Sequence, residues 1–486
     1  MKSNIFVFAA LATLSLPSML TSCDDFLDVR PKSETVESDL FSSAGGFEAA
    51  ILGVYGTMAS SALYGRDLLW GVTDVMAQDL AVNTQEMNAL ASFRYEENND
   101  LRRRFAYIWS NAYQAIGYAN NILANLDRRG GGMPLRDIYR GEMLAVRAYL
   151  HFDLLRLFCS TDTARQGIPY PTAYEPIMND FNTVGQTYRL ILADLREAER
   201  LLRETADIIV YPRDNSQYYA FQRYQETHAN YYAVLGILAK VHWTMGNMAE
   251  AARYARMVID SGKFPLAEPS EVADLFAGKL SDKETLWGLY STTYNETAQS
   301  YLYTYQTFHS YDPYTNTSGA TTPQPYQTVY SRNVEATVQD FRLQWFRQGT
   351  SYARFLKVCD YHTLDGGTSV PAGWSNRLSG VNLLHVSELY LIAADALLDS
   401  DPAAALTLYN AETAARGLPP RTQDQGLTHD IVFEEYHKEM FGEGQVWYNM
   451  KRRNMSIVSN HENRTIPASE SVYTIPIPQD EITYRN

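Results

Sequence analysis

Cysteine is scarce in this chain. It occurs three times in 486 residues, at Cys23, Cys159 and Cys359. So small a number excludes a disulfide-built scaffold, and no pair of cysteines has the spacing of a metal site. With Cys23 assigned to the N-terminal segment discussed below, Cys159 and Cys359 either form one disulfide or remain two buried thiols. We favour buried thiols, because free cysteine is among the most buried residue types.

The sequence also lacks the motifs of the common enzyme classes. It has no glycine-rich phosphate loop, dinucleotide fingerprint or Gly-x-Ser-x-Gly elbow, and His461-Glu462 lacks the second histidine of a zinc-protease helix. His151 and His242 are expected in the core rather than on a metal. Two carboxylates for glycoside hydrolysis could meet in space, but 56 acidic residues make a chance pair easy to find. We therefore expect no catalytic activity, no cofactor and no metal.

Positive charge is in deficit. The chain has 41 Lys and Arg residues against 56 Asp and Glu residues, a formal net charge of −15. Residues 1–22 hold one lysine and no acid, so residues 23–486 carry a net charge of 40 − 56 = −16. A body this acidic repels nucleic acid and anionic lipid surfaces, and we expect neither as a partner.

The first 23 residues have the order of a bacterial lipoprotein signal. Lys2 gives a positive start, the stretch 5–16 is apolar and uncharged, and Leu20-Thr21-Ser22-Cys23 closes the segment. This order predicts cleavage before Cys23 and attachment of lipid to its thiol. Residues 1–22 are then a signal peptide, and residues 23–486 form a folded body held to a membrane through the lipid anchor.

Two other interpretations of this segment are weaker. The apolar run is short for a bilayer span of ~20 residues and is followed by Pro17, which argues against a transmembrane helix. An ordinary secretory signal with a chance cysteine is disfavoured, because Cys23 falls where the small residues end.

Helical periodicity dominates the rest of the chain. Apolar residues recur every three or four positions over 109–126 and 142–158, which predicts two largely buried helices. The stretch 184–204 alternates apolar residues with charged pairs and predicts an amphipathic helix with one solvent face.

Two later segments, about 228–262 and 385–418, predict helix pairs that resemble each other. Small residues fall at matching places, Ala239 with Ala251 and Ala393 with Ala405, where two antiparallel helices can approach closely. Asp401-Pro402 suits the start of a second helix. The spacing favours tetratricopeptide-like repeats, although two unrelated helical hairpins would use small residues in the same way.

Tyrosine is the residue in excess, with 35 copies against 19 Phe and 7 Trp. Nine tyrosines fall in residues 290–330 among Thr, Ser, Asn, Gly and Pro, without a persistent apolar stripe. We interpret this segment as an exposed loop insertion made for contact. The stretches 83–99 and 365–377 are also predicted to be rich in loops and hold further aromatic residues.

Aromatic rings beside polar side chains predict a ligand-binding surface. Rings stack on the apolar C–H face of a sugar, while amides and carboxylates bind its hydroxyls. The composition fits a glycan platform, and it also fits a peptide groove or a protein interface. The candidate ligand-binding residues are Phe93, Tyr95, Tyr301, Tyr303, Tyr305, Tyr311, Tyr314, Tyr326 and Trp374.

Motifs spread along residues 23–486 point to one protein family. They are Cys23-Asp24-Asp25-Phe26-Leu27-Asp28 with Pro31, Trp109-x3-Tyr113-x2-Ile116-x3-Asn120, Glu142-x2-Ala145-x-Arg147-Ala148-x3-Phe152, Ser387-Glu388-Leu389-Tyr390-Leu391-Ile392-x-Ala394, Glu435-x3-Glu439-Met440-x2-Glu443-Gly444-x2-Trp447-x3-Lys451-Arg452 and Ile475-Pro476-Ile477-Pro478-x2-Glu481-Ile482. Together they resemble the SusD/RagB family of surface nutrient-binding lipoproteins of Bacteroidetes. The closing motif is the most specific of them.

The chain departs from the family pattern at four positions. His385 stands where the family usually has arginine, Tyr436 and Val446 replace two further arginines, and Asn449 replaces an aspartate. We expect altered salt bridges between helices rather than lost function. The family's binding loops have no fixed motif, so the resemblance transfers no ligand-binding residue.

The resemblance implies a mainly α-helical, SusD-like fold in which tetratricopeptide-like helix pairs pack against an irregular loop-rich region. Residues 23–486 would form one domain. Its parts would be an N-terminal helical part (about 23–225), the two helix pairs, the aromatic insertion (about 290–330) and a C-terminal part (about 330–486).

The resemblance also implies a function. The protein would be lipid-anchored in the outer membrane, facing the cell exterior, with the acidic residues after Cys23 as its export mark. It would bind oligo- or polysaccharide without turnover and deliver it to a SusC-like TonB-dependent transporter. A RagB-like capture of peptides is the alternative. A cap that binds only the transporter, and an enzyme, are further alternatives.

Overall fold

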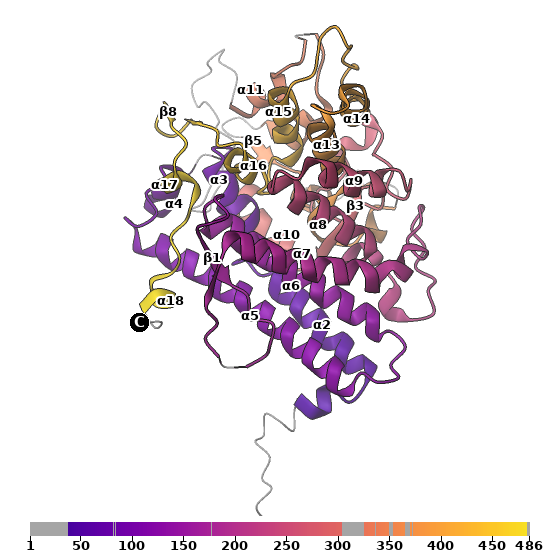
Figure 1. The fold of residues 1–486 in the computed structure, drawn as a ribbon. Helices are drawn as coiled ribbons and strands as arrows, with labels where there is room; N and C mark the ends of the chain where they lie inside the picture. The colour runs from indigo at the N-terminus through magenta and orange to yellow at the C-terminus, as the bar shows by residue number, and fades with distance from the viewer. Residues whose placement is uncertain are drawn as a thin grey trace, which may run out of the picture.

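The structure is a computed structural model that describes residues 37–80, 82, 84–175, 177–303, 325–335, 337–348, 353–364, 370–371 and 373–483. Within these residues the protein is mainly helical, and the strands are short (Figure 1). The predicted fold class is therefore confirmed. Cys23, Tyr305, Tyr311 and Tyr314 lie outside the described residues, as does the side chain of Tyr303.

The N-terminal half is a set of helices that occupies the lower part and the left side of Figure 1. They are α2 (Ala44–Met58), α3 (Thr73–Met76), α4 (Gln85–Ala91), α5 (Asn99–Arg129), α6 (Arg136–Phe158) and α7 (Val184–Leu202). Both α5 and α7 pack against α6, which leaves α6 buried along most of its length. The predicted helices at 109–126, 142–158 and 184–204 are all present.

Side chains at the helix starts explain two of these boundaries. The Asn98 side chain accepts hydrogen bonds from the backbone N–H groups of Asp100 (2.8 Å) and Leu101 (3.0 Å), so α5 begins there. Thr183 and Gln186 form a reciprocal capping box at the start of α7. A similar cap at Thr84 begins α4, so the stretch 83–99 is not the plain loop that its polar composition predicts.

The two predicted helix pairs are present as α8 (Tyr231–Thr244) with α9 (Met248–Ile259), and α13 (Val386–Leu397) with α14 (Pro402–Ala415). The pairs join through contacts between α9 and α13, in the upper right of Figure 1. The alanines at the predicted crossings have no exposed surface, so the helices approach closely there: Ala239, Ala251, Ala393 and Ala405. The Asp401 side chain caps α14 at the backbone N–H of Ala404 (3.1 Å).

The remaining helices are mostly short. They are the π-helices η2 (Asp67–Gly71) and η7 (Gln299–Tyr303), the 3-10 helices η3 (Arg203–Ala206), η4 (Ala220–Gln222), η5 (Gln225–Thr227), η6 (Pro269–Asp274), η8 (Phe341–Trp345) and η9 (Trp374–Asn376), and α10 (Tyr294–Ala298), α11 (Pro325–Ser331), α12 (Tyr361–Leu364), α15 (His429–Met440), α16 (Val446–Arg452), α17 (Glu470–Tyr473) and α18 (Gln479–Thr483). The described ends of the 290–330 segment are thus helical rather than irregular. Buried rings, among them Tyr294 and Tyr330, pack these ends onto the core.

The described strands form four antiparallel pairs. They are β1 (Gln166–Pro169) with β2 (Phe181–Thr183), β3 (Thr285–Tyr290) with β6 (Gly380–His385), β4 (Phe346–Gln348) with β5 (Ala353–Phe355), and β7 (Ile457–Ser459) with β8 (Arg464–Ile466). The β3–β6 pair places Thr285 opposite His385. It therefore joins the middle of the chain to the start of α13.

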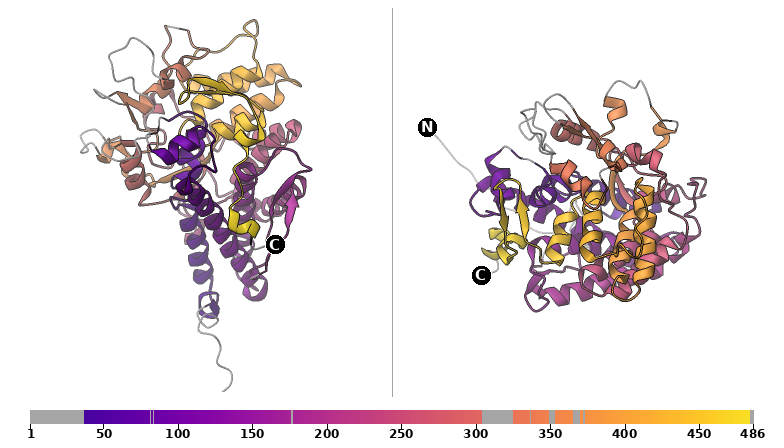
Figure 2. Two further views of the ribbon diagram at one scale, coloured as in Figure 1. Left: turned by 90° about the vertical axis from the view of Figure 1, so that its left-hand side faces the viewer. Right: turned by 90° about the horizontal axis from the view of Figure 1, so that it is seen from above.

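The C-terminal segment returns to the N-terminal helices. The Ile475 N–H donates to the Leu157 carbonyl (3.2 Å), and α18 lies beside α5 (Figures 1 and 2). Within the described part of the chain, no helix has both the length and the apolar character needed to span a bilayer.

The cysteines and the two helical histidines lie in the core, as predicted. Cys159 and Cys359 are buried free thiols, and burial raises the pKa of Cys159 to about 12. His151 is fully buried, and this burial lowers its pKa to about 3. His242 is also buried and stacks on Tyr254, which fits a core residue.

Candidate functional site

Two π-helical turns meet next to the tyrosine-rich segment. The Trp70 ring of η2 lies 5.8 Å, centroid to centroid, from the Tyr301 ring of η7. A Cβ at Gly71 would come within 2.8 Å of the Arg66 Cγ and of an Asp67 carboxylate oxygen, so only glycine permits this close turn. Single π-turns occur often at functional sites, which makes this junction a candidate.

A chain of ion pairs and hydrogen bonds starts at Tyr301. Arg66 donates to the Tyr301 hydroxyl (3.0 Å) and binds both carboxylate oxygens of Asp67 (2.7 and 3.1 Å). Arg104 of α5 donates to Asp67 (2.8 Å) and binds both oxygens of Glu86 (2.6 and 3.2 Å). We call these five residues the Arg66–Tyr301 cluster.

The cluster is partly open to solvent. The side chains of Arg66, Arg104 and Glu86 keep 14–16% of their surface exposed, whereas Asp67 keeps 2%. The planar guanidinium groups and carboxylates are held in place by one another, so ordering them on a ligand costs little. A half-buried phenol beside such groups is suited to binding polyols. The cluster has no nucleophile paired with a base.

The predicted ligand-binding residues separate into three groups. Tyr301 belongs to the Arg66–Tyr301 cluster and is half-buried. The side chains of Tyr303, Tyr305, Tyr311 and Tyr314 lie outside the described residues, so their role stays a prediction. The remaining four are at most 9% exposed: Phe93, Tyr95, Tyr326 and Trp374.

These four buried rings have core partners. The Tyr95 hydroxyl donates to the Val472 carbonyl (2.6 Å), and Phe93 packs edge-on against Tyr95. The Tyr326 ring stacks on Phe346 with centroids 4.4 Å apart. The Trp374 indole N–H donates to Asp360 (3.0 Å). In this structure their rings join chain segments to the core and offer almost no surface to a ligand.

Several exposed rings were missed by the sequence reasoning. They are Tyr107, Tyr118, Tyr174 and Tyr290, and on one loop Tyr211, Tyr218, Tyr219 and Tyr224. Periodicity could have found Tyr107, because it lies off the apolar stripe of α5 that passes through Trp109 and Tyr113. Tyrosines in loops have no such periodic pattern in the sequence that would indicate their exposure.

A large groove lies away from the Arg66–Tyr301 cluster, and none of the cluster's residues lines it. It is a groove of about 800 Å³ between α5, the loop 169–179 and the C-terminal segment 478–481. Tyr107 and Tyr174 line it, and both are half exposed. The five predicted ligand-binding residues whose side chains are described do not line this groove.

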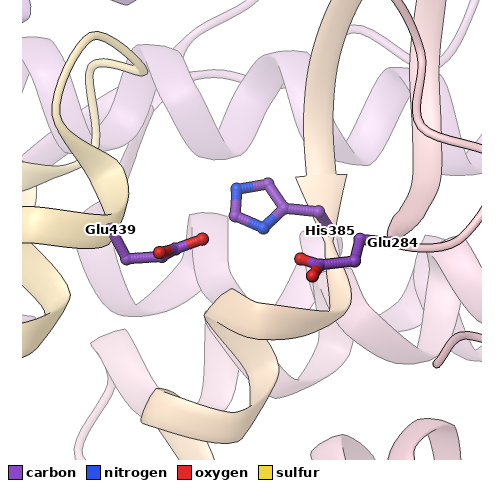
Figure 3. Close-up of side chains that lie close together, drawn as sticks. All are labelled: Glu284, His385 and Glu439. Atoms are coloured by element: carbon purple, nitrogen blue, oxygen red, sulfur yellow. The ribbon is translucent and has the colours of Figure 1, made fainter. Parts of the chain in front are cut away.

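One buried cluster has the residue types of a metal site but not its chemistry. Potential ligand atoms of Glu284, His385 and Glu439 lie within 4.8 Å of one another (Figure 3). Arg416 already binds both oxygens of Glu284 (3.0 and 2.9 Å) and both oxygens of Glu439 (2.8 and 2.6 Å). Arg342 also donates to Glu439 (3.1 Å), so two guanidinium groups already pair with these two carboxylates and occupy the oxygens that a cation would bind.

His385 is also unsuited to bind a metal. Its Nε2 lies 2.8 Å from Glu443, and its Nδ1 lies 2.5 Å from the Ser387 hydroxyl. Burial alone would lower the pKa of His385, but the charge and hydrogen bond of Glu443 outweigh burial and raise it. A histidine held in its protonated form has no lone pair for a metal ion.

The four residues that depart from the family pattern all lie in the core. His385 forms a buried ion pair with Glu443, and the Tyr436 hydroxyl donates to Glu388 (2.7 Å). Val446 is fully buried, and Asn449 accepts hydrogen bonds from Arg452. That these contacts replace salt bridges of the family stays a prediction.

Comparison with known proteins shows which proteins this chain resembles. Residues 25–241 match the model of a SusD-like family described as starch-binding and associating with the outer membrane. A SusD-like protein of Formosa agariphila is 23% identical over 513 residues, covering 95% of each chain. Another from the same organism is 20% identical and covers 94% of this chain and 92% of its own.

Solved structures share the fold. A SusD-like carbohydrate-binding protein of Bacteroides vulgatus has a TM-score of 0.68 at 19% identity, covering 91% of this chain and 96% of that one. A SusD superfamily protein of Bacteroides fragilis has a TM-score of 0.68 at 20% identity, covering 92% and 98%. Residues 25–241 thus match a SusD-like family model, and the described residues share the fold of these SusD-like structures.

Proposed function

We propose that this protein is a cell-surface lipoprotein that binds glycans and delivers them to a SusC-like TonB-dependent transporter in the outer membrane. The match of residues 25–241 to the SusD-like family model carries the proposal, because that family is described as starch-binding and associated with the outer membrane. A similar structure from Bacteroides vulgatus is described as a carbohydrate-binding protein.

The Arg66–Tyr301 cluster supports the same proposal. Its phenol, guanidinium groups and carboxylates provide the ring face and the hydrogen-bonding groups that a saccharide requires. The tyrosine-rich segment follows Tyr301 directly in the chain, so Tyr303, Tyr305, Tyr311 and Tyr314 remain candidate contacts. Binding would be non-covalent and without turnover.

Affinity electrophoresis in gels that contain defined polysaccharides tests the proposal. The wild-type protein should be retarded by at least one of starch, xyloglucan, galactomannan, β-glucan or pectin. Replacing Tyr301 by Ala should weaken this retention, and Tyr303→Ala with Tyr305→Ala should weaken it further. Tyr290→Ala is the matched control, because Tyr290 is 55% exposed at the end of β3.

Other outcomes would select the alternatives. Retention by no polysaccharide, together with binding of a mixed peptide pool, would replace glycan by peptide as the ligand class. Binding of neither, with a transporter that still requires the protein, would leave a cap of the transporter. New reducing ends after incubation with the best-bound glycan would indicate an enzyme.

A further inference from the structure

The groove on α5 is separate from the Arg66–Tyr301 cluster. Arg104 belongs to the cluster and Tyr113 lines the groove, and both lie on α5. They are 113 − 104 = 9 residues apart, which is about two and a half turns of helix. The two side chains therefore project to opposite sides of α5, although Tyr107, which also lines the groove, lies one turn from Arg104. No residue of the cluster lines the groove.

The outer wall of the groove is fixed in place. The Tyr113 hydroxyl donates to the Pro169 carbonyl (2.8 Å), and the Asn120 amide donates to the Pro171 carbonyl (2.9 Å). Arg147 in turn donates to the Asn120 side-chain oxygen (2.8 Å). These bonds tie the loop 169–174 to α5, so the groove is formed before a ligand arrives.

Two tyrosine rings at the groove are open to solvent, one on the loop wall and one on α5. Tyr107 is 56% exposed and Tyr174 is 50% exposed, although both line a concave surface. A Cβ added to Gly117 would lie 4.0 Å from the Tyr174 ring, which places this ring next to the helix backbone. The groove thus offers aromatic faces that the protein itself leaves uncovered.

A buried donor lines the same groove. Trp109 is 4% exposed, and its indole N–H has no acceptor among the residues that the structure describes. Buried donors without partners are rare in native proteins. Because the N–H itself is buried, Trp109 contributes apolar surface rather than a hydrogen bond to the lining of the groove.

The charge of the lining restricts the ligand. Glu175 and Asp480 are exposed at the groove, Glu481 also lines it, and none of the described lining residues is Lys or Arg. Carboxylates repel anions, which disfavours uronates, sulfated sugars and phosphates. A volume of about 800 Å³ suits a bound small molecule rather than a folded partner.

We propose that this groove is a second saccharide-binding site, which takes a neutral oligosaccharide and stacks it between Tyr107 and Tyr174. The proposal rests on the proposed function, since it assigns a glycan ligand to the protein. Two sites on opposite sides of α5 would hold one long polysaccharide more tightly than either site alone.

Titration of the mature protein with neutral hexasaccharides of glucose, mannose or xylose, and with oligogalacturonate, tests the assignment. In a protein that already carries Tyr301→Ala, adding Tyr107→Ala/Tyr174→Ala should weaken binding of the neutral ligand about tenfold, or abolish it, with an unchanged melting temperature. Tyr118→Ala is the matched control on α5, because Tyr118 is 41% exposed and does not line the groove. Tyr301→Ala should leave binding in the groove intact.

A charge variant tests the selectivity. Glu175→Gln/Asp480→Asn should raise binding of oligogalacturonate at low ionic strength and leave the neutral ligand unchanged, because screening is weakest there. Wild-type protein that binds oligogalacturonate through Tyr107 as tightly as a neutral oligosaccharide would overturn the neutral assignment.

The two proposals fail in different ways. A wild-type protein that binds saccharide, with Tyr107→Ala/Tyr174→Ala making no difference when added to Tyr301→Ala, would overturn the groove and leave the proposed function standing. A wild-type protein that binds no saccharide at all would overturn both.

Discussion

Arg416 binds Glu284 through two nitrogens, at 3.0 and 2.9 Å, and neither side chain has any exposed surface. The same guanidinium also pairs with Glu439 of α15. The arginine that directly follows α14 thus joins α15 to Glu284, the residue before β3. This contact connects parts of the chain that are more than 130 residues apart.

Removing this arginine should destabilise the protein strongly. Arg416→Met leaves Glu284 and Glu439 buried without their shared cation, and breaking a buried pair in this way costs about 3–5 kcal/mol. The free energy of unfolding from urea titration measures the loss. Arg253→Met is the control: Arg253 and Glu250 are each 46% exposed, and such pairs contribute about 0–1 kcal/mol. Equal losses in the two variants would show that water compensates the buried carboxylates.

The ion pair between His385 and Glu443 should make stability depend on pH in two ranges. Glu443 has its pKa lowered to about 2: burial alone would raise it, but His385 and Lys357 outweigh burial. Its contribution is therefore present above the unfolded pKa of about 4.5 and is lost as the pH falls towards 2. The pKa of His385 is raised, so its contribution is complete below about 6.5 and is lost as the pH rises through the folded value.

His385→Gln should therefore lower the free energy of unfolding most between about pH 4.5 and 6.5, by about 1.5–3 kcal/mol, the usual net contribution of a hydrogen bond to a charged group. The difference from wild type should shrink at higher pH. Lys357 (2.7 Å from Glu443) and the nearby Glu439 also act on the pair, so urea midpoints of both proteins are needed across pH 4–9. A difference that does not change with pH would mean that His385 is neutral in the folded protein.

The buried rings among the predicted ligand contacts should behave as core residues. Tyr326 is 3% exposed and stacks on Phe346, so Tyr326→Ala should cost about 3–5 kcal/mol of stability. Below its lower melting temperature, the variant should bind glycan like wild type. Tyr290→Ala, at a 55% exposed ring, should change stability by less than about 0.5 kcal/mol. Loss of binding by a folded Tyr326→Ala protein would return this ring to the ligand site.

Sequence periodicity predicted the helices better than it predicted the site. The stripe through Trp109 and Ile116 repeats every three to four residues, and burial on one side of α5 follows from that repeat alone. Small residues at Ala239 and Ala393 likewise predicted close helix crossings, because local size limits how near two backbones can come.

Exposure of single aromatic rings has no such local cause. Tyr95 and Tyr326 lie in polar surroundings in the sequence. In the fold, Tyr95 donates to the carbonyl of Val472 and Tyr326 stacks on Phe346. Neither partner is a neighbour in the sequence. The Arg66–Tyr301 contact joins residues 235 positions apart, and the groove on α5 needs residues 478–481 to close it. Only tertiary structure brings these pieces together.

The lipid that we propose on Cys23 should matter for uptake and not for binding. Cys23→Ala removes the thiol proposed to carry the lipid and leaves the candidate binding residues unchanged, so the purified variant should be retarded by polysaccharide like wild type. Cells that carry only this variant should fail to grow on that polysaccharide. The physical reason is local concentration: a protein held at the transporter mouth can transfer a weakly bound glycan, whereas a released one cannot. Surface labelling together with growth curves measures both parts. Normal growth with the released protein would show that the transporter itself holds the body in place, because contact with the barrel would then be strong enough without the anchor.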